Sequence, residues 1–345
     1  MGNDFRRDHS FRVPRPDQSV RYGNPNACMD CHADKSNQWA MDNVIRWYGP
    51  KRQENYSDKL LVALNQKMDK KEYADLLQFI QKQDQPAIAR ATLIDYLTLS
   101  GGEDFIRVLI HALADSSASV RYSALMKFTE VPVRQRLPIA LKHIVDTQRV
   151  VRIAAANLIV EVPMEEIEPS ARQGVVQARN ELLDMLNANA DFPLGRLQLG
   201  DYYMRQDRVQ KAIEHYEKAL EMDYLLIQAY SNLATAYNIS GKNEKAVSVL
   251  NRLIELEPEY GRAYYLHGLL MHELGNETDA INDLEQAIRF DAGNFRYYYN
   301  LSNMYLQTGK LKEAEETIDK GLKIELSSGD GRHLLEVIRR KKGEH

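Results

Sequence analysis

Apolar and small residues in the C-terminal half of the chain recur every 34 positions. One set of small residues consists of Ala212, Ala246, Ala280 and Ala314. A second set with the same spacing, mostly large and apolar, precedes the alanines and consists of Leu199, Leu233, His267 and Leu301. Glycines typical of turns lie between the two sets at Gly241, Gly275 and Gly309. The pattern predicts four helical pairs, over residues 193–226, 227–260, 261–294 and 295–328. A final amphipathic helix, Gly331 to Lys342, is expected to cover the open end.

This pattern, with small residues where helices touch and large ones between them, resembles the tetratricopeptide repeat (TPR). The resemblance implies a superhelix whose groove is lined by the first helix of each repeat, at its second, fifth, ninth and twelfth positions. The residues expected to contact a bound peptide are Asn238, Arg262, Tyr265, Arg296, Tyr299 and Asn303. TPR domains that clamp chaperone C-termini carry Lys and Asn in the first repeat. Leu197 and Asp201 stand at those places here, so that class of partner is not expected.

A second periodicity, of 31 residues, runs through the middle of the chain. Its polar members are Asp84, Asp115 and Asp146 together with Arg90, Arg121 and Arg152. The stretch from about residue 84 to 165 resembles HEAT repeats, in which an aspartate precedes the second helix of a pair. We expect the aspartates to cap helices and the arginines to bridge to a neighbouring repeat, so the charged series is interpreted as structural.

The predicted fold is all-α: a right-handed α-solenoid of HEAT-like repeats followed by a TPR superhelix, with a short irregular N-terminal segment. Three domains are expected. Residues 1–50 carry a cysteine motif, residues 51–191 hold the HEAT-like repeats and a connecting helix, and residues 192–345 hold four TPRs and the capping helix.

The only two cysteines of the chain form the pentapeptide Cys28-Met29-Asp30-Cys31-His32. The spacing C-x-x-C-H is the attachment motif of c-type haem, in which two thiols add to the porphyrin vinyl groups and the histidine binds the iron. We therefore predict covalently bound haem c on Cys28 and Cys31, with His32 as the proximal iron ligand.

Other interpretations of the motif stay open. A zinc site would need four ligands, and adjacent Cys31 and His32 rarely reach one tetrahedral ion together. A thioredoxin-like redox pair requires a βαβ context, of which the chain gives no sign. The cysteines could also be a disulfide or an inert pair. A helix over about Asp34–Tyr48, with Trp39 and Trp47 on one face, would supply an apolar wall, and His9 is a candidate sixth iron ligand.

The order of motif, helical ladder and TPRs resembles the C-terminal portion of bacterial multihaem cytochrome c family proteins that carry TPRs. In those proteins the last C-x-x-C-H lies near a segment similar to Asp8–Asp17 of this chain. The resemblance implies thioether bonds at Cys28 and Cys31 and an iron ligand at His32, whereas the further haem motifs of the family are missing here. Haem would be absent from a fragment produced in the cytoplasm.

Composition narrows the choice of partner and location. The chain has 345 residues with 44% apolar content and a formal net charge of −4, and its basic residues are dispersed, which argues against a nucleic-acid partner. No apolar run is long enough to cross a membrane, and no signal peptide opens the chain. Because haem attachment normally occurs outside the cytoplasm, we expect a piece of a longer, periplasmic or otherwise exported protein.

No enzymatic constellation is found: the sequence lacks a Ser/His/Asp arrangement, a phosphate loop and a His/Glu metal cluster. Two functions therefore compete. The chain is either a haem-bearing electron-transfer segment, docked through its TPRs to a partner or to its own upstream haem domains, or a haem-free adaptor that binds a partner protein or peptide.

Overall fold

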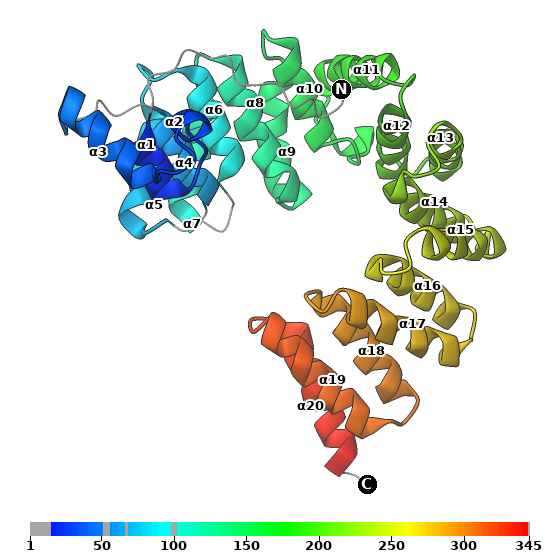
Figure 1. The fold of residues 1–345 in the computed structure, drawn as a ribbon. Coiled ribbons are helices and arrows are strands. Elements are labelled where there is room, and N and C mark those ends of the chain that lie inside the picture. Colours follow the sequence, from blue (N-terminus) through cyan, green and yellow to red (C-terminus); the bar gives the residue numbers. More distant parts are fainter. Residues whose placement is uncertain (1–14, 51–55, 66–67, 98–101, 344–345) are drawn as a thin grey trace. The chain divides into compact units, whose positions relative to one another are not determined.

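The computed structural model describes residues 15–50, 56–65, 68–97 and 102–343. Within these ranges the chain forms twenty α-helices and two short 3₁₀ helices and contains no strand. Figure 1 follows the helices in chain order. The all-helical solenoid predicted from the sequence is confirmed. The chain divides into two compact units, residues 1–159 with 173–178, and residues 160–172 with 179–345.

The first unit contains eleven of these elements. They are α1 (Pro16–Tyr22), α2 (Cys28–Cys31), α3 (Asn37–Tyr48), α4 (Tyr56–Asn65), α5 (Lys70–Gln81), α6 (Ala87–Tyr96), α7 (Gly102–Ala112), α8 (Ala118–Lys127), η2 (Phe128–Glu130), α9 (Val133–His143) and α10 (Arg149–Leu158). Helices α6, α8 and α10 pack side by side, and the residues between them, such as Leu93, Ala124 and Ala155, are fully buried. The small side chains allow the helices to approach closely.

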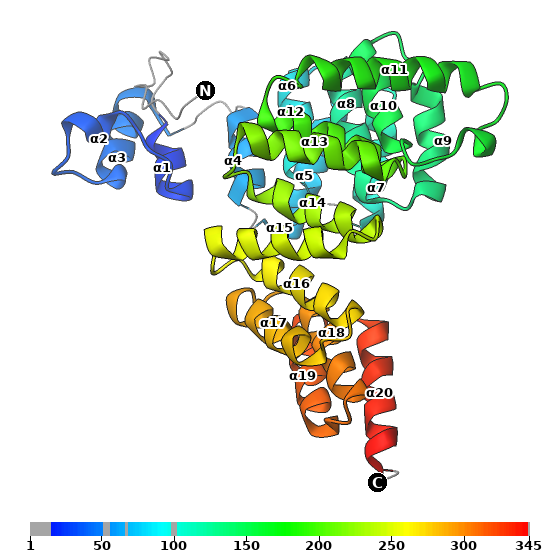
Figure 2. The same ribbon diagram turned by 90° about the vertical axis from the view of Figure 1, so that its right-hand side faces the viewer.

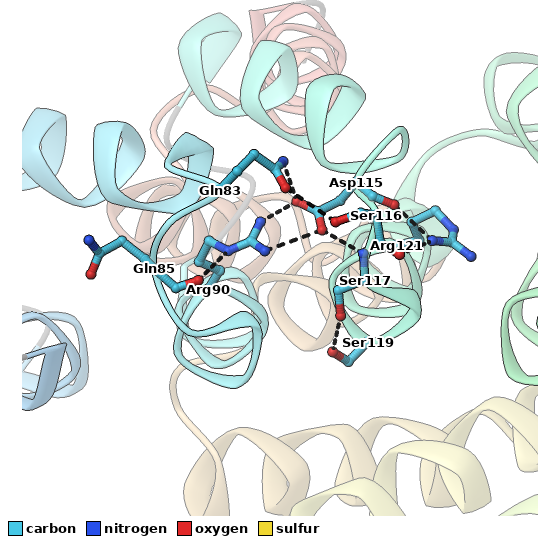
Figure 3. Close-up of polar contacts among 8 residues, drawn as sticks. All are labelled: Gln83, Gln85, Arg90, Asp115, Ser116, Ser117, Ser119 and Arg121. Carbon is cyan, nitrogen blue, oxygen red and sulfur yellow. Dashed lines mark hydrogen bonds and ion pairs between the residues drawn. The ribbon is translucent and has the colours of Figure 1, made fainter.

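Arginines and aspartates spaced by 31 residues tie these helices together, as Figure 3 shows around Asp115. The guanidinium of Arg90 pairs with the carboxylate of Asp115, and both side chains are almost completely buried. One repeat later, Arg121 pairs with Asp146 at 2.8 Å. Arg121 also donates to the main-chain oxygen of Asp115, at 2.7 Å. Each aspartate thus joins the arginine of the preceding repeat to the arginine of its own.

The Asp115 carboxylate is fully hydrogen-bonded in its buried position. It accepts from the Ser117 amide at 2.8 Å and from the Gln83 side chain at 2.8 Å, in addition to Arg90. Burial acts to raise the pKa of Asp115, but the hydrogen bonds from Arg90, the Ser117 amide and Gln83 outweigh it, and the pKa lies below its ordinary value. The ionised carboxylate is therefore the form that stabilises the fold.

The second unit consists of η3 and the helices that follow it. They are η3 (Met164–Glu166), α11 (Arg172–Ala188, of which 173–178 belong to the first unit), α12 (Pro193–Arg205), α13 (Val209–Met222), α14 (Ile227–Ile239), α15 (Asn243–Leu256), α16 (Gly261–Glu273), α17 (Glu277–Phe290), α18 (Phe295–Gln307), α19 (Leu311–Ile324) and α20 (Gly329–Gly343). Helices α12 to α19 form the four antiparallel pairs predicted from the period of 34, and α20 packs on α19 (Figures 1 and 2).

The paired helices touch at small residues. The alanines of the second helices, Ala212, Ala246, Ala280 and Ala314, have no exposed surface. A methyl group built on Gly200 in α12 would lie 2.2 Å from the ring of Tyr216 in α13. Because Tyr216 is itself buried, it has no room to move away. Glycine at this position is therefore required by the contact between α12 and α13.

We predict that Asp115→Asn lowers the free energy of unfolding of the first unit by about 3 kcal/mol at pH 7, because the buried Arg90 charge loses its partner. Since the pKa of Asp115 is lowered in the folded state, this contribution is present above the unfolded pKa of about 4 and is lost as the pH falls through the folded value. Pulse-labelling hydrogen exchange across a urea series, read on peptides from α6 and α8, would measure it.

Asp104→Asn is the matched control for this prediction, because it removes the same charge from the exposed pair with Arg107. An exposed pair contributes less than about 1 kcal/mol. Equal losses in the two variants would contradict the structural role assigned to Asp115.

Candidate functional site

The candidate site lies on the first helices of the four repeats, α12, α14, α16 and α18. We call the side chains at the second, fifth, ninth and twelfth positions of these helices the A-helix face. It comprises Leu194, Leu197, Asp201, Met204, Gln228, Ser231, Thr235, Asn238, Arg262, Tyr265, Leu269, His272, Arg296, Tyr299, Asn303 and Leu306. Three of them, Leu197, Ser231 and Leu306, are buried, and the others are partly or fully exposed.

Side-chain amides connect neighbouring first helices along this face. Asn232 in α14 donates to the Asp201 carboxylate in α12 at 2.8 Å. Asn300 in α18 donates to the Tyr265 hydroxyl in α16 at 2.9 Å. Asn238 at the end of α14 donates to the Glu273 carboxylate at the end of α16, at 2.6 Å. The first helices are thus held side by side by polar contacts as well as by the apolar core.

Asp201 is the single acid among the sixteen residues of the A-helix face. Its Oδ1 atom accepts hydrogen bonds from the Tyr216 hydroxyl at 2.7 Å and from Asn232. Burial raises the pKa of Asp201, and these hydrogen bonds offset the rise only in part. Burial and the neighbouring Asp201 carboxylate in turn raise the pKa of Tyr216. Asp201 therefore connects α12 to α13 and α14. Its hydrogen bonds lie within the repeats, whereas the lysine and asparagine of the chaperone-binding TPR domains bind the peptide.

Four of the six residues predicted to contact a peptide have side-chain polar groups with no partner among the residues that the structure describes. Arg262 and Arg296 are exposed, and no acid pairs with their guanidinium groups. Tyr299 is half-buried, with its ring 6.0 Å from that of Phe295, and Asn303 is half-buried in the middle of α18. The remaining two, Asn238 and Tyr265, take part in the contacts between first helices.

The contact between His267 and Asp283 is among the polar contacts within the repeats that the sequence analysis did not predict. His267 stands where the other three repeats have leucine, and its Nδ1 atom lies 2.6 Å from the Asp283 carboxylate in α17. Both side chains are largely buried, and the contact with Asp283 offsets the cost of burying the histidine where the other repeats have leucine. The one signal in the sequence was that a histidine occupies a position where the other three repeats have leucine, which indicates a polar partner nearby.

Family comparisons identify the repeats. Three family models described as tetratricopeptide repeat match residues 194–259, 232–295 and 271–335. Residues 194–335 are therefore tetratricopeptide repeats, and the prediction from the period of 34 is confirmed. The comparisons do not support HEAT repeats in the middle of the chain or a relation to multihaem cytochromes. The arginine–aspartate pairs spaced by 31 residues are therefore present in the structure, but the comparisons do not assign them to a repeat family.

The relatives found by comparison match this chain over part of their length. Protein O-mannosyl-transferase TMTC3 from Homo sapiens is 25% identical over 178 residues, which make up 50% of this chain and 20% of that protein. A TPR repeat-containing protein from Methanocaldococcus jannaschii is 27% identical over 163 residues, 44% of this chain and 28% of that protein. The chain therefore spans less than a third of the length of these curated relatives.

Among solved structures, one of MamA is 29% identical, covers 44% of this chain and 88% of that chain, and has a TM-score of 0.38. The matched family models all describe the same repeat, so residues 194–335 form a TPR protein–protein interaction scaffold.

The cysteine motif forms a small structure at the start of the first unit. Cys28 to Cys31 make the single turn of α2, which contains no buried residue. Cys28 is half-buried and Cys31 is exposed, and both are free thiols. The exposed ring of His32 lies 4.8 Å from that of Trp39. His9, the candidate sixth ligand, lies outside the described residues.

The predicted haem c cofactor is contradicted. No group of three or more His, Cys, Asp or Glu side chains that could hold a metal ion occurs within the described ranges, and the family models match TPRs alone. A physical reason is the lack of an apolar enclosure: α2 buries none of its residues, and Trp47, expected in the shielding wall, is 67% exposed. The haem-based part of the functional prediction is therefore not supported.

The expected periplasmic location is not supported, and no described helix is long and apolar enough to span a membrane.

We predict that Asp201→Ala lowers the free energy of unfolding of the second unit by about 1–3 kcal/mol, because the Tyr216 hydroxyl and the Asn232 amide lose their acceptor. Asp201→Asn keeps a carbonyl oxygen and costs less. The raised pKa of Asp201 means that folding favours the protonated acid, so wild-type stability declines as the pH rises from about 4 through the folded pKa.

Urea denaturation followed by hydrogen exchange in α12 and α14, at several pH values between 4 and 7, would measure both effects. The decline with pH should be absent in Asp201→Asn. A wild-type slope that survives in this variant would show that another group is responsible.

Proposed function

We propose that the A-helix face of this TPR stack binds an extended peptide segment of a partner protein. The observation that carries the proposal is a set of polar side chains in α16 and α18 that have no partner among the described residues: Arg262, Arg296, Tyr299 and Asn303. Asp201 differs from them, because its carboxylate is hydrogen-bonded within the stack.

The chemistry of these four residues suits a peptide. The Asn303 side-chain amide can donate to and accept from the main chain of an extended segment, which satisfies both its nitrogen and its oxygen. Tyrosine and arginine offer large contact areas with polar ends and are common anchors at protein interfaces. Helices α16 and α18 are held together by the Asn300–Tyr265 hydrogen bond and by the Tyr265 and Tyr297 rings, 4.7 Å apart. The binding residues therefore stand on a preorganised support.

Proteins with similar repeats give this proposal a precedent. A solved structure that is 24% identical and has a TM-score of 0.33 is of the first TPR of Spaghetti (RPAP3) bound to an HSP90 peptide. We propose the same general kind of ligand for this chain, a peptide, and not the same peptide. In this proposal residues 192–345 form the binding domain, residues 51–191 form a supporting helical domain, and residues 1–50 have no assigned role.

We predict that a random dodecapeptide library, selected on the immobilised full chain, yields peptides whose binding depends on the A-helix face. The double variant Tyr299→Ala/Asn303→Ala should bind these peptides at least about tenfold more weakly, because an aromatic contact and the amide bonds to the peptide main chain are lost. Fluorescence anisotropy with the selected peptides would give the dissociation constants.

The matched control is Tyr224→Ala/Asn251→Ala, which removes the same residue types from exposed positions off the A-helix face. The proposal fails if the selected peptides bind the two double variants equally well, or if no peptide is enriched.

A further inference from the structure

Two arginines occupy the same place in consecutive repeats. Arg262 is the second residue of α16 and Arg296 is the second residue of α18, 34 positions later. A tyrosine follows each of them three residues on, Tyr265 and Tyr299, and therefore lies on the same face of its helix. The pattern is confined to these two repeats, because the second positions of α12 and α14 are Leu194 and Gln228.

Both guanidinium groups lack an acidic partner within the part of the chain that the structure describes. Asp291 and Glu325 line an open surface depression together with Arg296, yet neither forms an ion pair with it within the described residues. Many other arginines of the chain are bonded: Arg121 joins Asp146, Arg205 joins Glu161 and Arg339 joins Glu315. The charge of the two arginines is thus available to a ligand.

The neighbouring tyrosines add donors. The Tyr265 hydroxyl accepts its hydrogen bond from Asn300, so its own hydrogen remains free to donate. Tyr299 has no hydrogen-bond partner in the described structure. Two guanidinium groups and two hydroxyl hydrogens are therefore available to a ligand, although the Asp291 and Glu325 carboxylates lie near Arg296. The complementary ligand is an anion, and within a peptide that means the carboxylates of Asp or Glu.

The spacing of the two arginines defines the spacing of the carboxylates. Helices α16 and α18 are joined by the Asn300–Tyr265 hydrogen bond and the Tyr265–Tyr297 ring contact, and helices in contact have axes about 8–10 Å apart. A peptide in the polyproline II conformation has three residues per turn and rises about 3.1 Å per residue. Its side chains at positions i and i+3 therefore point to the same side, about 9 Å apart. Adjacent acidic residues point in different directions and cannot reach both arginines.

We propose that Arg262 and Arg296, each with its tyrosine, bind two carboxylates three residues apart in an extended acidic segment of a partner protein. This inference rests on the proposed peptide-binding function and adds to it the charge and spacing of the ligand. The recognised groups are side-chain carboxylates within the segment, so a free C-terminus is not required.

The test uses the full chain and a fluorescein-labelled, amidated probe, Gly-Ser-Pro-Glu-Pro-Ala-Glu-Pro-Ser-Gly, in an anisotropy titration. Arg262→Gln and Arg296→Gln should each weaken binding about tenfold, and the double variant about a hundredfold, because each removes one charge-assisted contact. Binding should also weaken as salt is added, since the arginines are exposed. Arg208→Gln, which removes the same charge from an exposed position before α13, should leave binding unchanged.

Two further probes test the chemistry. One has glutamine in place of both glutamates, and the other has its two glutamates adjacent; both should bind at least about tenfold more weakly than the first probe. The inference is overturned if either of these probes binds as tightly as the first, if the arginine variants bind normally, if only a probe with a free C-terminus binds, or if the first probe does not bind. If the peptide library still yields neutral peptides that depend on Tyr299 and Asn303, the proposed function stands and only the acidic ligand is refuted.

Discussion

The close approach of paired helices at small residues is the constraint on which the second unit depends. The eighth residue of each first helix faces the second helix, and the four residues there are Gly200, Ala234, Gly268 and Ser302. The methyl group that alanine would bring at Gly268 lies 3.0 Å from the main-chain oxygen of Ala280. Ser302 is tolerated because its hydroxyl donates to the equivalent oxygen, of Ala314, at 2.7 Å. Small residues at these positions therefore allow the two helices of each pair to approach closely.

The repeats can be predicted from the sequence because side-chain size recurs with the same period. The prediction misses positions where a repeat uses a chemically different residue, such as an aspartate in place of a turn glycine. Three repeats turn at a glycine with positive φ, as at Gly241, whereas the first repeat turns at Asp207, with a φ of 57°. Aspartate tolerates this conformation better than most residues, but no rule of spacing reveals it. The same holds for His267 and Asp283, because a periodic pattern shows which positions are buried and not which polar atoms meet there.

The cysteine motif shows the limit of reading a site from spacing. The pentapeptide Cys28 to His32 states which groups are near one another along the chain, and the structure agrees that they share one turn of α2. A cofactor also needs an enclosure, which comes from residues distant in sequence. The A-helix face is the opposite case: its members are far apart along the chain, yet their positions were predictable because each repeat places them alike.

Arginine has two different uses in this protein, and its surroundings distinguish them. In the first unit, Arg90 and Arg121 each reach a carboxylate 25 residues ahead as well as a main-chain oxygen five or six residues behind. Their donors serve the fold, so they have little left to offer a ligand. In α16 and α18 the aligned Arg262 and Arg296 point to no acid of the described chain. Because no ion pair joins either of them to an acid of the described residues, the stability of the repeats does not explain the charge at either position.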